Sequence, residues 1–312
     1  MKKSVLKRLA EALRFDLVVE RTGNAAWQHC KAGRKGFGDA SLLGCTMLSP
    51  LYDAESIRKT GRKLEEDREL RKIFNLKKAP DHSSLSKWLK RKGIDFLSKI
   101  MKELVKVAMR IGLIRGDLIA IDSTGIDSFT SKANKTYSTD PSASWGYLKK
   151  GKDGEAILFH GYKVHLAVDC NSELPVAFAV LPANVHDSDG FGYAFDSLKN
   201  TIPSFQIKKV LADAGYDTAY IKQYLRDINI IPAIAINGRG HYASAKPKDP
   251  DYSKRWAIER NNGLMKKHYG LNDLKVKGIE KATKHCYVCY ISMLASSIGK
   301  YVLGYKRYRS IY

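Results

Sequence analysis

The spacing of apolar residues changes once along the chain, near residue 112. Up to that point apolar residues recur every three or four positions, which is the period of an amphipathic helix. Beyond it, short apolar runs bounded by turn residues alternate with helical stretches. We therefore predict a helical region over residues 1–112 and a mixed α/β domain over residues 113–312.

Within the second region, the apolar runs at 118–122 and 208–213 each end in an aspartate and are typical of strands buried on both faces. The runs at 162–169 and 175–181 are rich in β-branched residues and predict a hairpin that turns near Asp169. The other expected elements are helices at 189–202, 218–228, 252–266 and 280–303 and a strand at 230–236. Stretches rich in Gly, Ser, Lys and Pro predict loops at 31–39, 130–154 and 237–251.

The charge of the chain indicates a polyanionic partner. It carries 54 Lys and Arg against 32 Asp and Glu, a net charge of +22. Residues 1–112 hold 26 basic and 13 acidic residues, which is more than half of the excess. Nucleic acid is favoured over a membrane surface, because the longest apolar run, 286–299, contains polar residues and is shorter than the ~20 residues that span a bilayer. The basic N-terminus is not followed by the apolar segment of a signal peptide.

The basic residues are concentrated at 71–93, which holds eight Lys and Arg and one acid. Pro80 and Asp81 predict a turn, and Ser83 or Ser84 is expected to cap a helix after it. Its predicted apolar stripe consists of Leu85, Trp88 and Leu89, and its predicted outward residues are Lys87, Lys90, Arg91 and Lys92. We expect Lys87, Arg91 and Lys92 to bind DNA; the alternative is an ordinary solvated charged face.

The five cysteines are scattered and odd in number, which favours a reduced, cytosolic protein. Cys286 and Cys289 form one C-x2-C pair beside a histidine. No second pair follows, and the run has a helical pattern, so core packing is favoured over a metal site.

Three carboxylates are the candidates for chemistry. Asp122 and Asp213 end two buried strands, and such ends converge on one crevice in an α/β sheet. Glu259, on a helix packed against that sheet, could join them and complete a site for Mg²⁺ or Mn²⁺, which prefer oxygen ligands. A pair of such ions can activate a water or a 3′-hydroxyl and stabilise the leaving oxygen of a phosphodiester. Asp127 and Asp217 lie close by as competitors, and both could be helix caps or surface acids.

The stretch YSKRWAIERNNGLMK, residues 252–266, carries four polar residues along one line of the predicted helix. Tyr252, Arg255, Glu259 and Lys266 fall within roughly 60° around the axis at about 100° per residue. If Glu259 faces the metal, then Arg255 and Lys266 face the flanking phosphates. Tyr252 can donate a hydrogen bond to a phosphate or stack on a displaced base.

Several neighbouring residues are left out of the predicted site. Lys163 and His165 lie on a strand near the first acid, and His165 is expected to be packed or hydrogen-bonded rather than a ligand. His186 and Asp187 follow the end of a strand, which could bring them near the site, but they are expected to stabilise a loop as a pair. Three apolar residues of the 252–266 helix are expected to anchor it to the core: Trp256, Ile258 and Met265.

The spacing of Tyr252, Arg255, Glu259 and Lys266 resembles the Tyr-Arg-Glu-Lys signature of the insertion-sequence DDE transposases of families 4 and 5. Four further blocks are similar to those of this group and occur in the same order: AIDSTGID, HGYKVHLAVD, PANVHDS and LADAGYD. The stretch PDHSSLSKWLKR resembles a block common in their N-terminal regions. The resemblance covers about residues 75–275.

This resemblance implies an RNase H-like catalytic domain, preceded by a helical DNA-binding region, with Asp122, Asp213 and Glu259 binding divalent metal. It also implies cleavage of double-stranded DNA at terminal inverted repeats, transfer of the 3′-hydroxyl into target DNA, and action as a homodimer on paired ends in the cytoplasm of a prokaryotic cell. Some members carry a large β-rich insertion before the glutamate. The interval between Asp213 and Glu259 is too short for one here.

Two other functions stay open. One is an RNase H-like nuclease that cuts without strand transfer, against which the basic helical region argues. The other is a catalytically silent relative that only binds terminal repeats, against which the complete set of Asp122, Asp213, Glu259, Arg255 and Lys266 argues.

Overall fold

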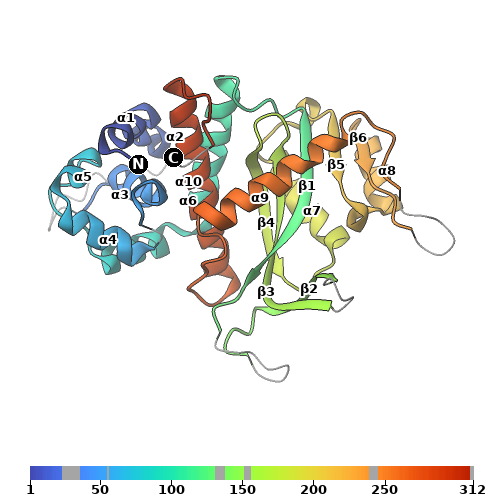
Figure 1. The fold of residues 1–312 in the computed structure, drawn as a ribbon, viewed down its shortest axis with the longest axis horizontal. Helices are drawn as coiled ribbons and strands as arrows, with labels where there is room; N and C mark the ends of the chain where they lie inside the picture. The colour runs from blue at the N-terminus through green and yellow to red at the C-terminus, as the bar shows by residue number, and fades with distance from the viewer. Residues whose placement is uncertain (23–35, 55, 131–137, 151–155, 239–244, 310–312) are drawn as a thin grey trace. The chain divides into compact units, whose positions relative to one another are not determined.

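The structure is a computed structural model that describes residues 1–22, 36–54, 56–130, 138–150, 156–238 and 245–309 (Figure 1). The chain forms two compact units. The first contains Met1–Ala108, His268–Gly270 and Cys286–Tyr312, and the second contains Met109–Lys267 and Leu271–His285. The predicted division into 1–112 and 113–312 stays a prediction, and the C-terminal segment is grouped with the first unit.

The first unit is helical throughout its described part. Its elements are α1 (Lys3–Leu13), α2 (Phe15–Arg21), α3 (Asp39–Met47), the 3-10 helix η2 (Ser49–Tyr52), α4 (Ile57–Glu66), α5 (Arg68–Ile73), most of α6 (His82–Arg110) and the second half of α10 (Ile279–Val302). Helix α1 packs tightly on α10, since a Cβ placed on Gly299 would lie 2.8 Å from Leu9 Cδ2. Cys286 and Cys289 are buried in this helix, which confirms core packing. No helix in the described residues is long and apolar enough to cross a membrane.

Helix α6 follows the predicted turn, but the capping residue differs. Asp81 Oδ1 accepts a hydrogen bond from Ser84 N at 2.6 Å, so Asp81 is the cap and the expectation of Ser83 or Ser84 is wrong. Leu85, Trp88 and Leu89 are buried, as the apolar spacing predicts. The helix breaks at Gly93, where φ is +75°, a conformation that favours glycine.

Lys92 does not point outward as expected. Its Nζ lies 2.5 Å from Asp39 Oδ2, and its side chain is only 8% exposed. Asp39 also accepts a hydrogen bond from Trp88 Nε1 at 2.8 Å. This one carboxylate of α3 therefore holds two side chains of α6, Trp88 and Lys92. Lys87, Lys90 and Arg91 remain exposed. Before the break at Gly93, these three residues form the outward basic surface of the helix, and Lys99 and Lys106 are exposed further along it.

The second unit is built on one six-stranded sheet (Figure 1). The strands are β1 (Leu118–Asp127), β2 (Ser144–Lys150), β3 (Ala156–Asp169), β4 (Leu174–Pro182), β5 (Lys209–Ala212) and β6 (Ile231–Ile234). β3 pairs antiparallel with β1, β2 and β4, whereas β5 pairs parallel with β1 and β6. An antiparallel hairpin beside a central strand, followed by two parallel strands, is an RNase H-like order, which confirms the predicted fold class.

Helices connect the parallel part of this sheet. α7 (Asp187–Lys199) links β4 to β5, and α8 (Ala219–Asp227) links β5 to β6. Short 3-10 helices lie at Ser204–Gln206 (η3), Ala214–Tyr216 (η4) and Tyr252–Arg255 (η5), and α9 (Trp256–His268) follows the last of them. The predicted hairpin, the strands around 208–213 and 230–236, and the helices between them are confirmed.

The stretch 130–154 was expected to be a loop, but it contains β2. β3 begins at Ala156, before the predicted strand, and its exposed edge pairs with β2 over Ser144↔Gly161 to Lys150↔Ala156. The pairing satisfies the backbone N–H and C=O groups of both strands. A Gly- and Ser-rich composition does not reveal that such a pairing partner exists. The other two predicted loops lie partly outside the described residues.

Helix α7 packs closely over β3 at Gly190. A Cβ placed there would lie 2.1 Å from His165 Cε1, whereas a Cβ on Gly192 would meet nothing within 4 Å. His165 is fully buried, as expected for a packed histidine, and its two ring nitrogens have no hydrogen-bond partner among the described residues.

This packing predicts opposite effects of two alanine substitutions in one helix. Gly190→Ala should lower the free energy of unfolding by about 1–3 kcal/mol, because the buried imidazole must move. Gly192→Ala should leave it unchanged or raise it by up to ~1 kcal/mol through helix propensity. Denaturant unfolding of both variants measures this difference, and equal effects would contradict the close packing.

Candidate active site

The pairing of β1 with β5 places Asp122 beside Asp213. Their parallel register ends at Ile121↔Ala212, so the two aspartates are the next residues on adjoining strands. β5 ends there, whereas β1 continues to Asp127, beyond the predicted end of the strand. Asp213 caps η4, its Oδ1 accepting a hydrogen bond from Gly215 N at 2.8 Å.

The pKa values of these two carboxylates are raised. Burial and the neighbouring Asp213 together raise the pKa of Asp122 to about 7, against the opposing effects of Ser123 N and Arg255. Burial also raises the pKa of Asp213. Two partly buried acids that repel each other provide a favourable environment for a cation.

Arg255 lies between two of the predicted catalytic acids. Its Nη1 is 3.4 Å from Asp122 Oδ2, and its Nη2 is 2.7 Å from Glu259 Oε1. The Arg255 side chain is 16% exposed and that of Glu259 is 54% exposed. Glu259 is thus joined to Asp122 through the guanidinium, and no three Asp, Glu, His or Cys side chains in the described part of the chain form a metal-binding group.

The segment expected to be one helix at 252–266 is divided. Tyr252–Arg255 forms the 3-10 helix η5, and the α-helix α9 begins at Trp256. Tyr252 Oη donates to Ala212 O at 3.3 Å, at the end of β5, and Lys266 Nζ donates to Gly125 O at 3.1 Å, on β1. The polar residues of this segment therefore contact the two strands that carry the aspartates.

The expected core anchors of α9 are correct in two of three positions. Ile258 and Met265 are fully buried, but Trp256 is 59% exposed, so the prediction for Trp256 is wrong. Asn261 anchors the helix instead, since it is buried and its Nδ2 donates to Glu173 O at 3.0 Å.

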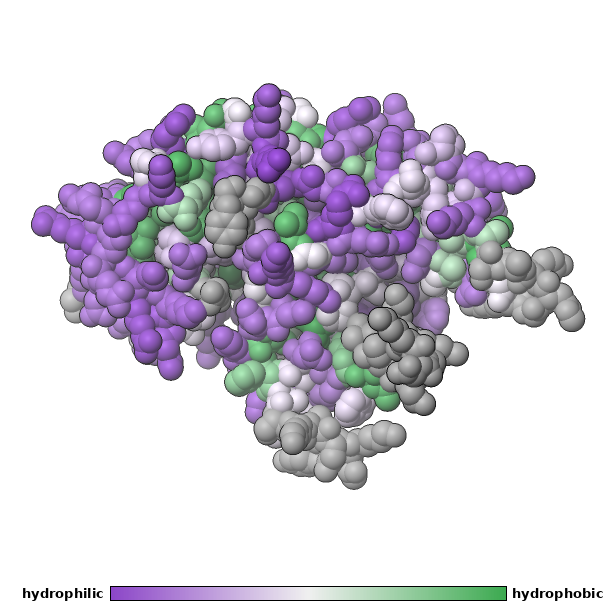
Figure 2. Space-filling model, viewed as in Figure 1, coloured by the Kyte–Doolittle hydropathy of each residue, from purple (hydrophilic) through white to green (hydrophobic). Residues whose placement is uncertain are grey.

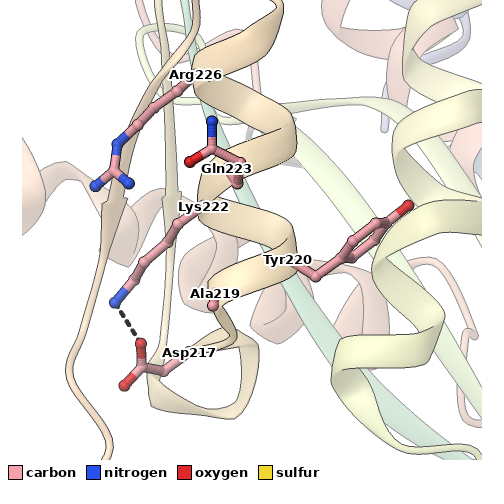
Figure 3. Close-up of a pocket in the computed structure, with 6 residues that line it drawn as sticks. All are labelled: Asp217, Ala219, Tyr220, Lys222, Gln223 and Arg226. Atoms are coloured by element: carbon pink, nitrogen blue, oxygen red, sulfur yellow. Dashed lines mark hydrogen bonds and ion pairs between the residues drawn. The ribbon is translucent and has the colours of Figure 1, made fainter.

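The two competing aspartates have other surroundings. Asp127 is exposed at the end of β1. Asp217 pairs with Lys222 in an open pocket beside α8 (Figure 3). Its Oδ2 also accepts a hydrogen bond from Asn237 N at 2.7 Å. Asp217 therefore connects α8, through Lys222, with the segment that follows β6.

Asp187 is a fourth carboxylate at this site that the sequence reasoning assigned elsewhere. Its Oδ1 accepts hydrogen bonds from Ser123 Oγ at 2.8 Å and from Lys163 Nζ at 3.0 Å. The expected pair of His186 with Asp187 is wrong, because His186 Nδ1 instead caps α7 through Ser188. The sequence feature that could have identified Asp187 as a site residue is its position at the start of a helix, shortly after a strand.

An RNase H-like sheet with two acids side by side on adjoining strands suits phosphodiester chemistry, and sequence comparison identifies its family. Residues 114–295 match the family model described as "Transposase DDE domain". Residues 2–91 match a second model, "Transposase domain (DUF772)". The first match covers more than half of the chain, so the chain belongs to the DDE transposases, enzymes that cleave DNA and transfer its strands with the help of divalent metal.

Solved structures with a similar chain path were also found. The catalytic core domain of BIV integrase aligns with 13% identity and a TM-score of 0.34, covering 57% of this chain and 83% of that one. The piggyBac transposase in a synaptic complex with hairpin DNA aligns with 8% identity and a TM-score of 0.37, covering 98% and 82%. A pre-cleavage Mos1 transpososome aligns with 8% identity and a TM-score of 0.23, covering 90% and 84%. No curated protein matches the chain.

The raised pKa of Asp122 predicts a pH-dependent effect of Asp122→Asn. The folded protein holds this proton more tightly than the unfolded chain does, so ionisation of Asp122 costs stability as the pH rises from about 4 through about 7. In metal-free buffer, the variant should therefore gain more stability over the wild type at about pH 8 than at about pH 4.5.

Thermal unfolding at the two pH values measures this difference. Asp95→Asn is the control, because Asp95 is 79% exposed and pairs only with Lys99 among the bonds of the described residues. A gain for Asp122→Asn that does not change with pH would contradict the account of the two carboxylates.

Proposed function

We propose that this transposase cleaves DNA at the terminal inverted repeats of an insertion sequence and joins the freed 3′-hydroxyl to target DNA at a centre formed by Asp122, Asp213 and Glu259. The observation that carries the proposal is the register of β1 and β5, which sets Asp122 beside Asp213. Arg255 contacts both Asp122 and Glu259, which supports the inclusion of Glu259 in the proposed centre. The exposed fraction of Glu259 leaves it free to reorient.

In this proposal the centre takes a pair of Mg²⁺ or Mn²⁺ ions. The site offers only hard carboxylate oxygens, and its repelling aspartates gain from added positive charge. Asp122 and Asp213 would hold the ions, with Glu259 as a further ligand. When bound, the ions supply a polarised water or 3′-hydroxyl and stabilise the leaving oxygen.

Arg255 has two roles in this proposal. Without DNA its guanidinium supplies the charge that keeps Asp122 and Glu259 together. With DNA its planar fork can contact a phosphate beside the scissile bond. Lys266 supplies a second positive charge, and burial lowers its pKa. Tyr252 lies at the end of β5, beside Asp213, where its hydroxyl can reach a phosphate or its ring a displaced base.

The helical first unit is proposed to bind the DNA ends. Lys87, Lys90 and Arg91 are exposed on the part of α6 before Gly93, and Lys92 is removed from the proposed contacts because it pairs with Asp39. Two copies of the chain are proposed to act together on paired ends, on chromosomal DNA in the cytoplasm. A nuclease without strand transfer and a catalytically silent repeat-binding protein are the outcomes that the experiments below can reveal.

The role of Glu259 can be tested with Glu259→Gln. Because the amide keeps the shape of the side chain but is a poorer metal ligand, cleavage of a labelled duplex carrying the element's ends should fall by at least about 100-fold. DNA affinity should stay nearly unchanged. Gel analysis of cleavage and fluorescence anisotropy of binding give the two readouts.

Glu280→Gln is the matched control, since Glu280 is also an exposed glutamate paired with a basic residue four positions away on a helix. It should keep wild-type cleavage. Comparable cleavage by Glu259→Gln would remove Glu259 from the centre, and loss of binding together with cleavage would indicate a structural role.

The basic surface of α6 can be tested through salt dependence. Replacing Lys87, Lys90 and Arg91 by Gln should weaken DNA binding and reduce the slope of log K against log salt by about 0.9 for each lost phosphate contact. The control carries Gln at Lys7, Lys99 and Lys106, which are exposed lysines already paired with acids. Equal slopes for the two triple variants would contradict the contact.

A further inference from the structure

Asp187 is a carboxylate near the proposed centre that the proposed function leaves unused. It begins α7, and its Oδ1 is held from two strands, by Ser123 on β1 and by Lys163 on β3. Lys163 is itself fixed, because its Nζ also donates to Val185 O at 3.0 Å. The position of the Asp187 side chain is therefore determined by the sheet rather than by its own helix.

The second oxygen of Asp187 lies on the side of Asp213. Asp187 Oδ2 and Asp213 Oδ1 lie 3.5 Å and 3.0 Å from one point, the place where a Cβ on Gly215 would be. Asp187 contributes to the raised pKa of both Asp122 and Asp213. Oδ2 makes no hydrogen bond within the described residues, so it is an oxygen donor available on the Asp213 side of the centre.

Tyr216 gives an independent indication that a ligand belongs here. Its side chain is fully buried, and its hydroxyl makes no hydrogen bond of good geometry among the described residues. Burial raises its pKa well above the usual value, the charges of Asp122, Asp187 and Asp213 add to this effect, and the nearby Ser123 opposes it. A buried hydroxyl without a partner costs free energy unless a ligand or a water bonds to it.

We propose that Asp187 is a fourth carboxylate of the metal centre, which binds a divalent cation or its coordinated water through Oδ2, while Ser123 and Lys163 hold Oδ1. Asp187 lies on the face of the centre next to Asp213, and Glu259 approaches Asp122 from α9 through Arg255. The inference rests on the proposed metal site at Asp122 and Asp213. The inference also assigns a role to Lys163. In it, Lys163 orients the carboxylate of Asp187, whereas without a metal ligand at Asp187 the lysine would only neutralise its charge.

The test measures Mn²⁺ binding to the full chain by calorimetry, in parallel with metal-free unfolding. Asp187→Asn should weaken Mn²⁺ binding by about 10- to 100-fold. Asp189→Asn is the matched control, because Asp189 is an exposed acid of the same first helical turn, and its affinity should equal that of the wild type. An unchanged affinity for Asp187→Asn, with or without lower stability, would overturn the proposal and leave Asp187 a structural partner of Lys163.

Lys163→Met separates orientation from charge and serves if Asp187→Asn does not fold. Removing a positive charge near the centre strengthens cation binding if Lys163 acts only through its charge. The proposal predicts the opposite, a weaker binding of Mn²⁺, because Asp187 loses its donor. Tighter binding by Lys163→Met would contradict the orienting role.

Asp122→Asn distinguishes failure of this inference from failure of the proposed function. If Asp122→Asn loses Mn²⁺ binding while Asp187→Asn keeps it, only the role of Asp187 is overturned. If Asp122→Asn binds Mn²⁺ as the wild type does, the metal centre itself is misplaced, and the inference fails with it.

Discussion

The parallel register between β1 and β5 is the constraint on which the site depends. Because Ile121 pairs with Ala212, the next residue on each strand is an aspartate, and the two side chains are brought together by backbone hydrogen bonds made before them. A shift of one residue would turn one aspartate to the other face of the sheet. The buried apolar residues on both strands oppose such a shift, so the hydrophobic core fixes the spacing of two groups that repel each other.

That repulsion explains the arrangement around the aspartates. Arg255 is placed by η5 against Asp122 and Glu259, and its guanidinium supplies positive charge in a region that is otherwise acidic. On the other side, Lys163 neutralises part of the charge of Asp187. The site thus resembles a cation-binding centre whose positive charge comes from the chain itself. Binding of metal and DNA would require Arg255 to exchange carboxylates for phosphate, two partners that suit the same planar fork.

The sequence predicted those features that follow from local pattern. Continuous apolar runs located β1 and β5, and the acids at the ends of these runs followed from the same pattern, although β1 continues past Asp122 to Asp127. The ordered motifs indicated the family. Contacts between residues far apart in the sequence could not be predicted in this way. β2 forms by pairing with the edge of β3, and Lys92 turns inward to pair with Asp39 on another helix. Asp187 is held at the site by Ser123 and Lys163, which come from two different strands. The change from η5 to α9 was also missed, since 3-10 and α-helix share similar apolar spacing.

The central claim is that the register-paired aspartates form the centre that cuts the ends of a mobile element. The most direct measurement incubates the purified protein with Mn²⁺ and an end-labelled duplex carrying the repeats that flank its own gene, and maps the products on a denaturing gel. The account predicts a cut with a free 3′-hydroxyl at the element boundary, present in the wild type and absent with Asp122→Asn or Asp213→Asn. Cutting at the boundary by either variant, or equal cutting of unrelated DNA by the wild type, would contradict it.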